Sequence, residues 1–191
     1  MLKLKKISII ALLLISIASI SLNVYQYNKL SVRKRSDYSR AKNSMNNHES
    51  SFMNALRVPA NNPILQYIKS SDNISSIIEQ IEESECYYQE ACDYVQDYKL
   101  SNRRSGGSEQ LINLYLADLR EYRSSIENEN LKLYSGNVNQ TMNDLQVICN
   151  WLKERKESSI FTVYTDDDFY TNVYPKLKSN IKKYSFFAEN S

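Results

Sequence analysis

The chain has 191 residues, a formal net charge of +2, 15 tyrosines, and only 3 glycines and 3 prolines. So small a net charge excludes a general electrostatic attraction to nucleic acid. So few helix-breaking residues favour long helices over a fold of many short strands. The richness in Asn, Lys, Ile and Tyr is typical of an AT-rich bacterial genome.

The N-terminal segment has the layout of a signal anchor. Residues 1–6 form a basic region with three lysines, and residues 7–27 contain no charged side chain. This order is typical of chains handed to the export machinery, and Tyr25 and Tyr27 suit a membrane–water interface. The best cleavage site, at residues 19–21, is a poor small-x-small match. We therefore expect an uncleaved, single-pass transmembrane helix over 7–27.

Basic residues directly after this segment bear on the membrane topology. Taken alone, these basic residues satisfy the positive-inside rule if the domain that follows them is cytoplasmic. The basic start of the chain argues for the opposite arrangement, and we expect the domain to be extracytoplasmic at the cell membrane. In both cases these side chains are predicted to contact anionic head groups: Lys29, Arg33, Lys34 and Arg35.

Residues 28–57 are predicted to form a basic juxtamembrane helix that continues into a membrane-proximal one. An apolar stripe with heptad spacing runs along its second half: Tyr38, Ala41, Met45, His48, Phe52 and Ala55. Pro59 and Pro63 are expected to end the helix. The stripe has two interpretations, since it suits either packing within the chain or oligomerisation of a structural stalk.

Residues 64–191 are predicted to form a soluble helical domain. One helix is expected from Ser70–Asp72 to about Leu100, and a glycine-containing loop at 101–107 separates it from the next. The third helix is expected to continue past Leu133 to Gly136, and a fourth to cover 137–156. Apolar steps of three and four with short connections predict an all-α, antiparallel bundle of about four to five helices.

The last part of the domain has a different pattern. The β-branched and aromatic run 160–164 is either a short strand or an extended connector. Thr165 followed by three aspartates predicts a helix start, because carboxylates suit the positive end of a helix. Pro175 should kink or restart this helix, whose apolar side then continues to the end of the chain: Leu177, Ile181 and Tyr184.

The sequence carries no recognisable catalytic motif, and we expect no enzyme activity, no cofactor and no bound metal. His48 is the only histidine, and its place on an apolar stripe favours a packed residue over an acid–base catalyst. The contiguous aspartates 166–168 lack the alternating spacing of a calcium loop and are better explained as a helix cap.

Three cysteines, Cys86, Cys92 and Cys149, leave the redox state open. Cys86 and Cys92 lie six residues apart on one helix, too far along the axis for a disulfide. Cys92 and Cys149 are both expected near the core, so a disulfide, if one forms, should join these two. The alternative is that all three are free thiols.

Residues 79–97 hold seven acidic side chains and no basic one, and residues 87–98 hold four interleaved tyrosines. This pattern suits a docking face for a cationic peptide or protein, with the following candidate residues: Glu83, Tyr87, Glu90, Tyr94 and Asp97. The alternative is a solvated face whose acids pair with Arg103, Arg104, Arg120 and Arg123. The leading hypothesis is a membrane-anchored, protein- or peptide-binding module, and the alternative is a stalk for assembly.

Overall fold

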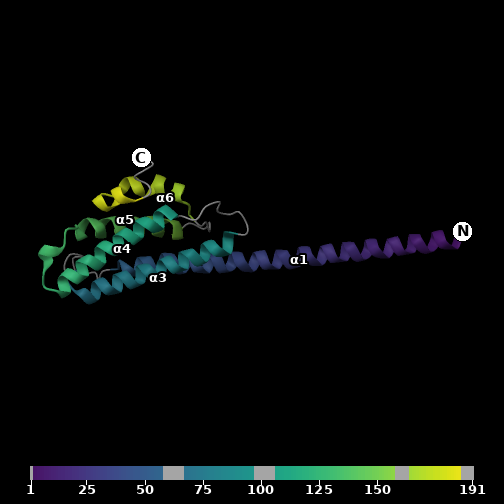
Figure 1. Ribbon diagram of the computed structural model, residues 1–191, viewed down its shortest axis with the longest axis horizontal. Helices are drawn as coiled ribbons and strands as arrows, with labels where there is room; N and C mark the ends of the chain where they lie inside the picture. Colours follow the sequence, from purple (N-terminus) through teal and green to yellow (C-terminus); the bar gives the residue numbers. More distant parts are fainter. Residues whose placement is uncertain (1, 58–66, 97–105, 158–163, 186–191) are drawn as a thin grey trace. The chain divides into compact units, whose positions relative to one another are not determined.

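The computed structural model describes residues 2–57, 67–96, 106–157 and 164–185; within these ranges, the side chains of residues 2–13, 96, 106, 133 and 182 are not described. This part of the chain is helical and contains no strand, which confirms the all-α prediction (Figure 1). The α-helices are α1 (Leu2–Ala55), α3 (Ser71–Gln96), α4 (Gly106–Glu127), α5 (Val138–Glu157) and α6 (Asp166–Asn172). Three short 3₁₀ helices follow α4 and α6: η1 (Leu131–Leu133), η2 (Tyr174–Lys176) and η3 (Asn180–Tyr184).

The chain divides into two units, Met1–Ser39 and Arg40–Ser191, so that α1 contributes to both. In the first unit, the large apolar side chains from Leu14 to Val32 are 55–73% exposed. They lie on every side of the helix, because they do not follow a helical period. Among the residues that the structure describes, no helix is long and apolar enough to cross a membrane.

The second half of α1 belongs to the larger unit and packs there through the predicted stripe. Five of its six residues are at most 6% exposed: Ala41, Met45, His48, Phe52 and Ala55. The sixth, Tyr38, belongs to the first unit and is 43% exposed, so the buried stripe starts one heptad step later than predicted. Burial of these side chains within the chain's own bundle favours packing within the chain over oligomerisation as the role of this stripe. The helix ends at Ala55, and both prolines expected to end it lie outside the described residues.

Hydrogen bonds between neighbouring helices give the helix directions. Residue numbers fall along one helix as they rise along the other in every pair, so α1 (from residue 40), α3, α4 and α5 form an antiparallel series. The pairs between α1 and α3 are Ser44–Glu90, His48–Ser84 and Ser51–Gln80. Those between α3 and α4 are Gln89–Glu109, Glu82–Arg120 and Ser75–Arg123, and those between α4 and α5 are Tyr115–Asp144 and Asp118–Thr141. The predicted antiparallel bundle is confirmed.

The core of the larger unit is rich in aromatic side chains. The ring of Tyr164 stacks on Tyr88 with centroids 4.4 Å apart and meets Trp151 edge-on at 4.9 Å. Tyr88 Oη donates a hydrogen bond to the carbonyl oxygen of Tyr164 at 2.7 Å, so its buried hydroxyl is paired. Each such ring buried from water stabilises the fold by roughly 1.5–3 kcal/mol.

The third helix is shorter than predicted, because α4 ends at Glu127 rather than near Gly136. Glu129 has a positive φ of 52°, and the backbone N–H groups of Glu129 and Asn130 donate to the carbonyls of Ile126 (3.0 Å) and Ser125 (2.9 Å). This pair of bonds is a Schellman motif, which turns the chain out of the helix. The expected continuation through Leu133 is therefore wrong. The helical spacing of apolar side chains gives no sign of such a backbone turn.

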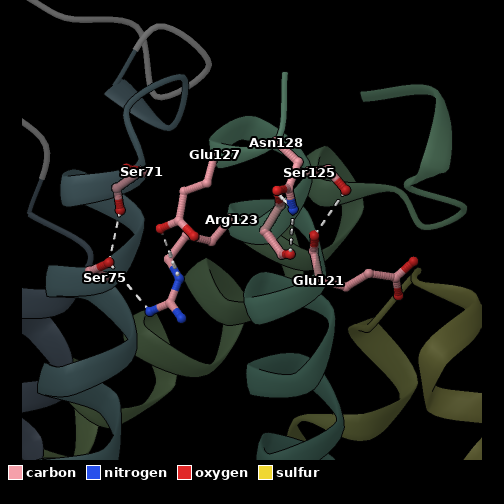
Figure 2. Close-up of polar contacts among 8 residues, drawn as sticks. Ser71, Ser75, Glu121, Arg123, Ser125, Glu127 and Asn128 are labelled. Atoms are coloured by element: carbon pink, nitrogen blue, oxygen red, sulfur yellow. Dashed lines mark hydrogen bonds and ion pairs between the residues drawn. The ribbon is translucent and has the colours of Figure 1, made fainter. Parts of the chain in front are cut away.

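Polar side chains surround this end of α4 (Figure 2). Arg123 lies between Glu127, 3.5 Å away in an i,i+4 ion pair, and Ser75 Oγ of α3, 3.4 Å away. Asn128 Nδ2 donates to the carbonyl oxygen of Ser124 at 2.8 Å. The contact between Arg123 and Ser75 joins the end of α4 to the first turns of α3, and the other two stabilise the end of α4 itself.

The fourth predicted helix is confirmed, since α5 covers Val138–Glu157. The helix start at Thr165 is also confirmed, because Thr165 Oγ1 accepts a hydrogen bond from the backbone N–H of Asp168 at 3.3 Å. Residues 160–163, the candidate strand, lie outside the described residues, and so does most of the loop at 101–107.

After Pro175 the prediction of a continued helix is wrong. The predicted apolar side holds for Leu177, which is buried, and for Ile181, which packs against the core, but Tyr184 is 77% exposed. In place of an α-helix, the described backbone here forms the 3₁₀ turns η2 and η3. The cause is the buried carboxylate of Asp144, whose two oxygens accept the backbone N–H groups of Lys178 and Ser179, each at 2.8 Å. Those two groups are therefore used to attach this segment to α5 rather than to extend a helix.

Candidate functional site

The predicted acidic face of α3 contains two carboxylates in matching surroundings. Glu83 accepts a hydrogen bond from Tyr87 Oη at 3.2 Å. Ser51 Oγ of α1 lies 3.2 Å from the same carboxylate, and its single proton is shared between Glu83 and the carbonyl oxygen of Gln80 at 3.0 Å. Glu90 accepts hydrogen bonds from Tyr94 Oη at 3.3 Å and from Ser44 Oγ of α1 at 2.7 Å. Each carboxylate thus has one donor from its own helix and one from α1. We call Glu83, Tyr87, Glu90 and Tyr94 the carboxylate edge.

The two halves of the carboxylate edge repeat because the two helices are antiparallel. Glu83 and Glu90 are seven residues apart on α3, and Ser51 and Ser44 are seven residues apart in the opposite direction on α1. Seven residues span about 10.5 Å of helix axis. The carboxylates are therefore held at a fixed spacing along one side of α3. Asp97, the fifth candidate, lies outside the described residues.

Both glutamates of the edge keep their negative charge accessible. Glu83 and Glu90 are exposed, and all four of their hydrogen-bond donors are neutral hydroxyls. Neither glutamate is in an ion pair within the part of the chain that the structure describes. The hydrogen bond to Glu83 also raises the pKa of Tyr87, which keeps this phenol protonated as a donor.

A cation contacts the edge at the ring of Tyr94. The guanidinium of Arg40 lies over the ring of Tyr94, 5.8 Å from its centroid. The interpretation of a solvated face paired with arginines holds for Glu82, which forms an ion pair with Arg120. Arg123 pairs with Glu127 instead, and the other two arginines named for this pairing lie outside the described residues.

His48 lies inside the larger unit, where it is 0% exposed. Its Nδ1 is 2.9 Å from the carbonyl oxygen of Ser84 and 2.8 Å from Ser84 Oγ, which itself donates to the carbonyl of His48 at 2.8 Å. Nδ1 therefore carries the proton, and Nε2 accepts from Tyr164 Oη at 3.4 Å. Burial lowers the pKa of His48 to about 4. A neutral, enclosed imidazole with two partners joins α1 to α3 and has no access to a substrate.

Two further ionisable groups lie close to this histidine along α1 and α3. Burial raises the pKa of Glu49 to about 7, against the attraction of Lys156 and Arg155 on α5. Burial, together with repulsion from Glu109 on α4, raises the pKa of Glu85 to about 8. Glu85 Oε1 is buried without a hydrogen-bond partner among the described residues. The interface of α1, α3 and α4 therefore contains carboxyl groups that resist ionisation.

The aspartates 166–168 act as helix caps and ion-pair partners. Asp166 accepts from the backbone N–H groups of Gly107 and Ser108, each at 3.1 Å, and so caps the start of α4. Asp168 pairs with Arg155 at 2.6 Å. Within the described residues, no cluster of three or more histidine, cysteine, aspartate or glutamate side chains has the arrangement of a metal site.

The cysteines carry thiols rather than a disulfide, with Cys86 exposed and both Cys92 and Cys149 buried. Burial also raises the pKa of Cys149, which makes its thiolate less accessible. The Cys92–Cys149 disulfide remains a prediction for an oxidising compartment.

The four basic residues predicted to touch head groups are exposed on α1: Lys29, Arg33, Lys34 and Arg35. Arg33 pairs with Asp37, one turn further along, at 3.7 Å.

The pattern of the sequence did not identify the two serines of the carboxylate edge or the role of Asp144. Ser44 and Ser51 flank the buried stripe of α1 at heptad spacing, and that spacing matches Glu83 and Glu90. The shared spacing of seven residues could have pointed to these serines, but only if the antiparallel pairing of α1 and α3 had been known.

The chain matches no protein-family model, no curated protein and no solved structure.

Proposed function

We propose that this protein is a membrane-anchored, non-enzymatic helical module that binds a cationic protein or peptide segment on the carboxylate edge of α3. The proposal rests on two exposed carboxylates of the edge that form no ion pair among the described residues. Glu83 and Glu90 are exposed, and each is oriented by two neutral hydroxyl donors. Orientation without neutralisation suits a surface that receives basic side chains, because a pre-oriented acceptor loses less entropy on binding.

The anchor part of the proposal is supported by the sequence. Residues 7–27 contain no charge, and a basic region lies on either side of them. The exposed apolar side chains between Leu14 and Val32 need a non-aqueous environment or a partner. Lys29, Arg33, Lys34 and Arg35 then suit a surface of anionic head groups.

The proposed topology places the larger unit outside the cytoplasm. The exposed thiol of Cys86 is a natural reporter, because the other two cysteines are buried. A membrane-impermeant maleimide should label Cys86 in intact cells, and a Cys86→Ser variant should not be labelled. Labelling of Cys86 only after lysis would place the unit in the cytoplasm.

In the alternative proposal, an assembly stalk, one surface is still available for contacts between chains. The stripe from Ala41 to Ala55 is buried in the bundle, so a stalk that oligomerises would do so through the exposed apolar side chains of residues 14–32. Light scattering of the detergent-extracted chain separates the two proposals, since a stable oligomer would favour assembly and a monomer favours the binding module.

The binding proposal is tested with a fluorescein-labelled helical peptide that presents lysines seven residues apart. We expect it to bind the full chain in lipid nanodiscs, and the double variant Glu83→Gln/Glu90→Gln to weaken binding by about tenfold, or 1.4 kcal/mol. The matched control is Glu154→Gln/Glu157→Gln, which removes two exposed carboxylates from α5. Equal weakening in both variants would indicate non-specific attraction and contradict the proposal.

A further inference from the structure

A pocket of about 790 Å³ lies where α4 ends and η1 begins. Its apolar lining comes from Tyr122, Ile126 and Leu131, and its polar lining includes Lys69 and Lys132. The pocket shares no residue with the carboxylate edge. A site here would therefore be a second surface, independent of the function proposed above.

The apolar lining is unusually accessible for this unit. Leu131 is 56% exposed, and Tyr184 is the only other large apolar side chain of the larger unit that is exposed among the described residues. Tyr122 and Ile126 are half-buried beside it. The ring of Tyr122 is fixed by an edge-on contact with Tyr134, with centroids 5.1 Å apart. A partly covered aromatic and aliphatic floor is what an incoming apolar side chain would contact.

The backbone groups around the pocket are already paired. The carbonyls of Ser124, Ser125 and Ile126 accept hydrogen bonds from the chain that turns away after α4. The negative end of this helix is therefore closed by the turn. The polar groups left at the pocket are side chains, and two of them are ammonium groups.

The two lysines give the pocket its charge preference. Lys69 and Lys132 belong to segments far apart in the sequence and are both exposed. Neither is in an ion pair within the part of the chain that the structure describes. Glu129 is the acidic residue of the lining, so the lining carries a net charge of +1. A carboxylate of a partner placed between the lysines would be attracted by both.

We propose that this pocket binds a segment of another protein in which an aliphatic or aromatic side chain is flanked by an acidic residue. The apolar side chain would cover Leu131 between Tyr122 and Ile126. The acidic side chain would reach Lys69 and Lys132, which distinguishes this partner from the cationic one proposed for α3.

The test is selection of random displayed peptides on the full chain in nanodiscs, with empty nanodiscs as the background. We expect enrichment of peptides with an apolar residue beside Asp or Glu. Synthetic copies should lose about tenfold in affinity for Leu131→Asp and for Lys69→Glu/Lys132→Glu. The matched controls are Tyr184→Asp and Lys153→Glu/Lys183→Glu, which alter an exposed tyrosine and two exposed lysines elsewhere; they should leave the affinity unchanged.

Several results would overturn the proposal. Selected peptides with basic flanks, no enrichment over empty nanodiscs, or affinities unaffected by the pocket variants would each do so. Self-association of the wild-type chain that Leu131→Asp abolishes would instead assign the pocket to a second copy. Thermal unfolding of every variant shows whether the fold is retained, and all six substituted residues are exposed.

Discussion

The two halves of α1 belong to one continuous helix but meet opposite environments. From Leu14 to Val32 the large apolar side chains are 55–73% exposed, whereas from Ala41 to Ala55 the stripe is at most 6% exposed. The difference arises from the pattern and not from apolar content alone. Apolar residues on every side of a helix suit a surrounding apolar medium, whereas one stripe suits a packed neighbour.

The comparison also explains where polar contacts form. The packed half of α1 places Ser44, His48 and Ser51 against α3, and each of them makes a hydrogen bond across the interface. The bond from Ser44 orients the carboxylate of Glu90 in the proposed binding edge, and the other two join α1 to the backbone of α3. Near the end of the first half, Arg33 forms an ion pair with Asp37 of the same helix. The packed half therefore supports the fold and the edge together, and the first half is available for an anchor.

The largest expected effect is on stability when a core ring of the packed half is removed. Phe52→Ala should lower the free energy of unfolding by about 3–5 kcal/mol, because it leaves a cavity in the bundle. Ile20→Ala, in the exposed half, should change it by no more than about 0.5 kcal/mol. Both are measured by denaturant unfolding of the detergent-extracted chain, followed by Trp151 fluorescence. Similar losses for the two variants would contradict the division of α1.

A smaller effect is expected from pH, and only through buried groups. The pKa values of Glu49 and Glu85 are raised to about 7 and about 8. Because both glutamates ionise near pH 4.5 when unfolded, their stabilising effect is complete below that pH and is lost as the pH rises toward 8. The pKa of His48 is lowered to about 4, so stability is also lost as the pH falls from about 6.5 toward 4.

Between pH 4.5 and 6.5 the two glutamates outweigh the single histidine, so the free energy of unfolding should be greatest near pH 4.5–5 and fall by about 3–4 kcal/mol by pH 8. Glu85→Gln should flatten the alkaline side of this profile, whereas Asp37→Asn in the first unit should leave it unchanged. Chemical unfolding at a series of pH values measures the profile. An alkaline slope that Glu85→Gln does not reduce would assign the titration to other groups.

The sequence was sufficient to predict the helices and much of the core. Heptad steps identified the buried stripe of α1, and Thr165 with the aspartates after it identified the start of α6. These features depend on residues close together in the chain. The end of α4 was predicted wrongly because Glu129 adopts a positive φ that its residue type does not suggest.

Features that depend on distant residues could not be predicted. Asp144 holds the backbone of Lys178 and Ser179, and an aspartate within an α-helical sequence gives no sign of a partner some thirty-five residues away. The candidate edge was predicted only in part. The glutamates and tyrosines were recognisable from their spacing on α3, but the serines that orient them come from α1 and depend on the register between the two helices.

The smallest expected effect separates the polar contacts of the two halves of α1. Ser44→Ala removes a 2.7 Å hydrogen bond to Glu90 and should lower the free energy of unfolding by about 0.5–1.5 kcal/mol. Arg33→Gln removes an ion pair whose arginine is 70% exposed, and should change it by less than about 0.5 kcal/mol.

A double-mutant cycle of Ser44→Ala with Glu90→Gln isolates the bond between α1 and α3. A favourable coupling energy would mean that packing of α1 orients Glu90, since the hydroxyl acts on the carboxylate directly. The same cycle repeated with the lysine peptide bound would then show whether that orientation contributes to binding. Zero coupling in the free chain would mean that Glu90 is oriented by its own helix alone, through Tyr94. Packing of α1 against α3 would then have no effect on the binding edge at Glu90.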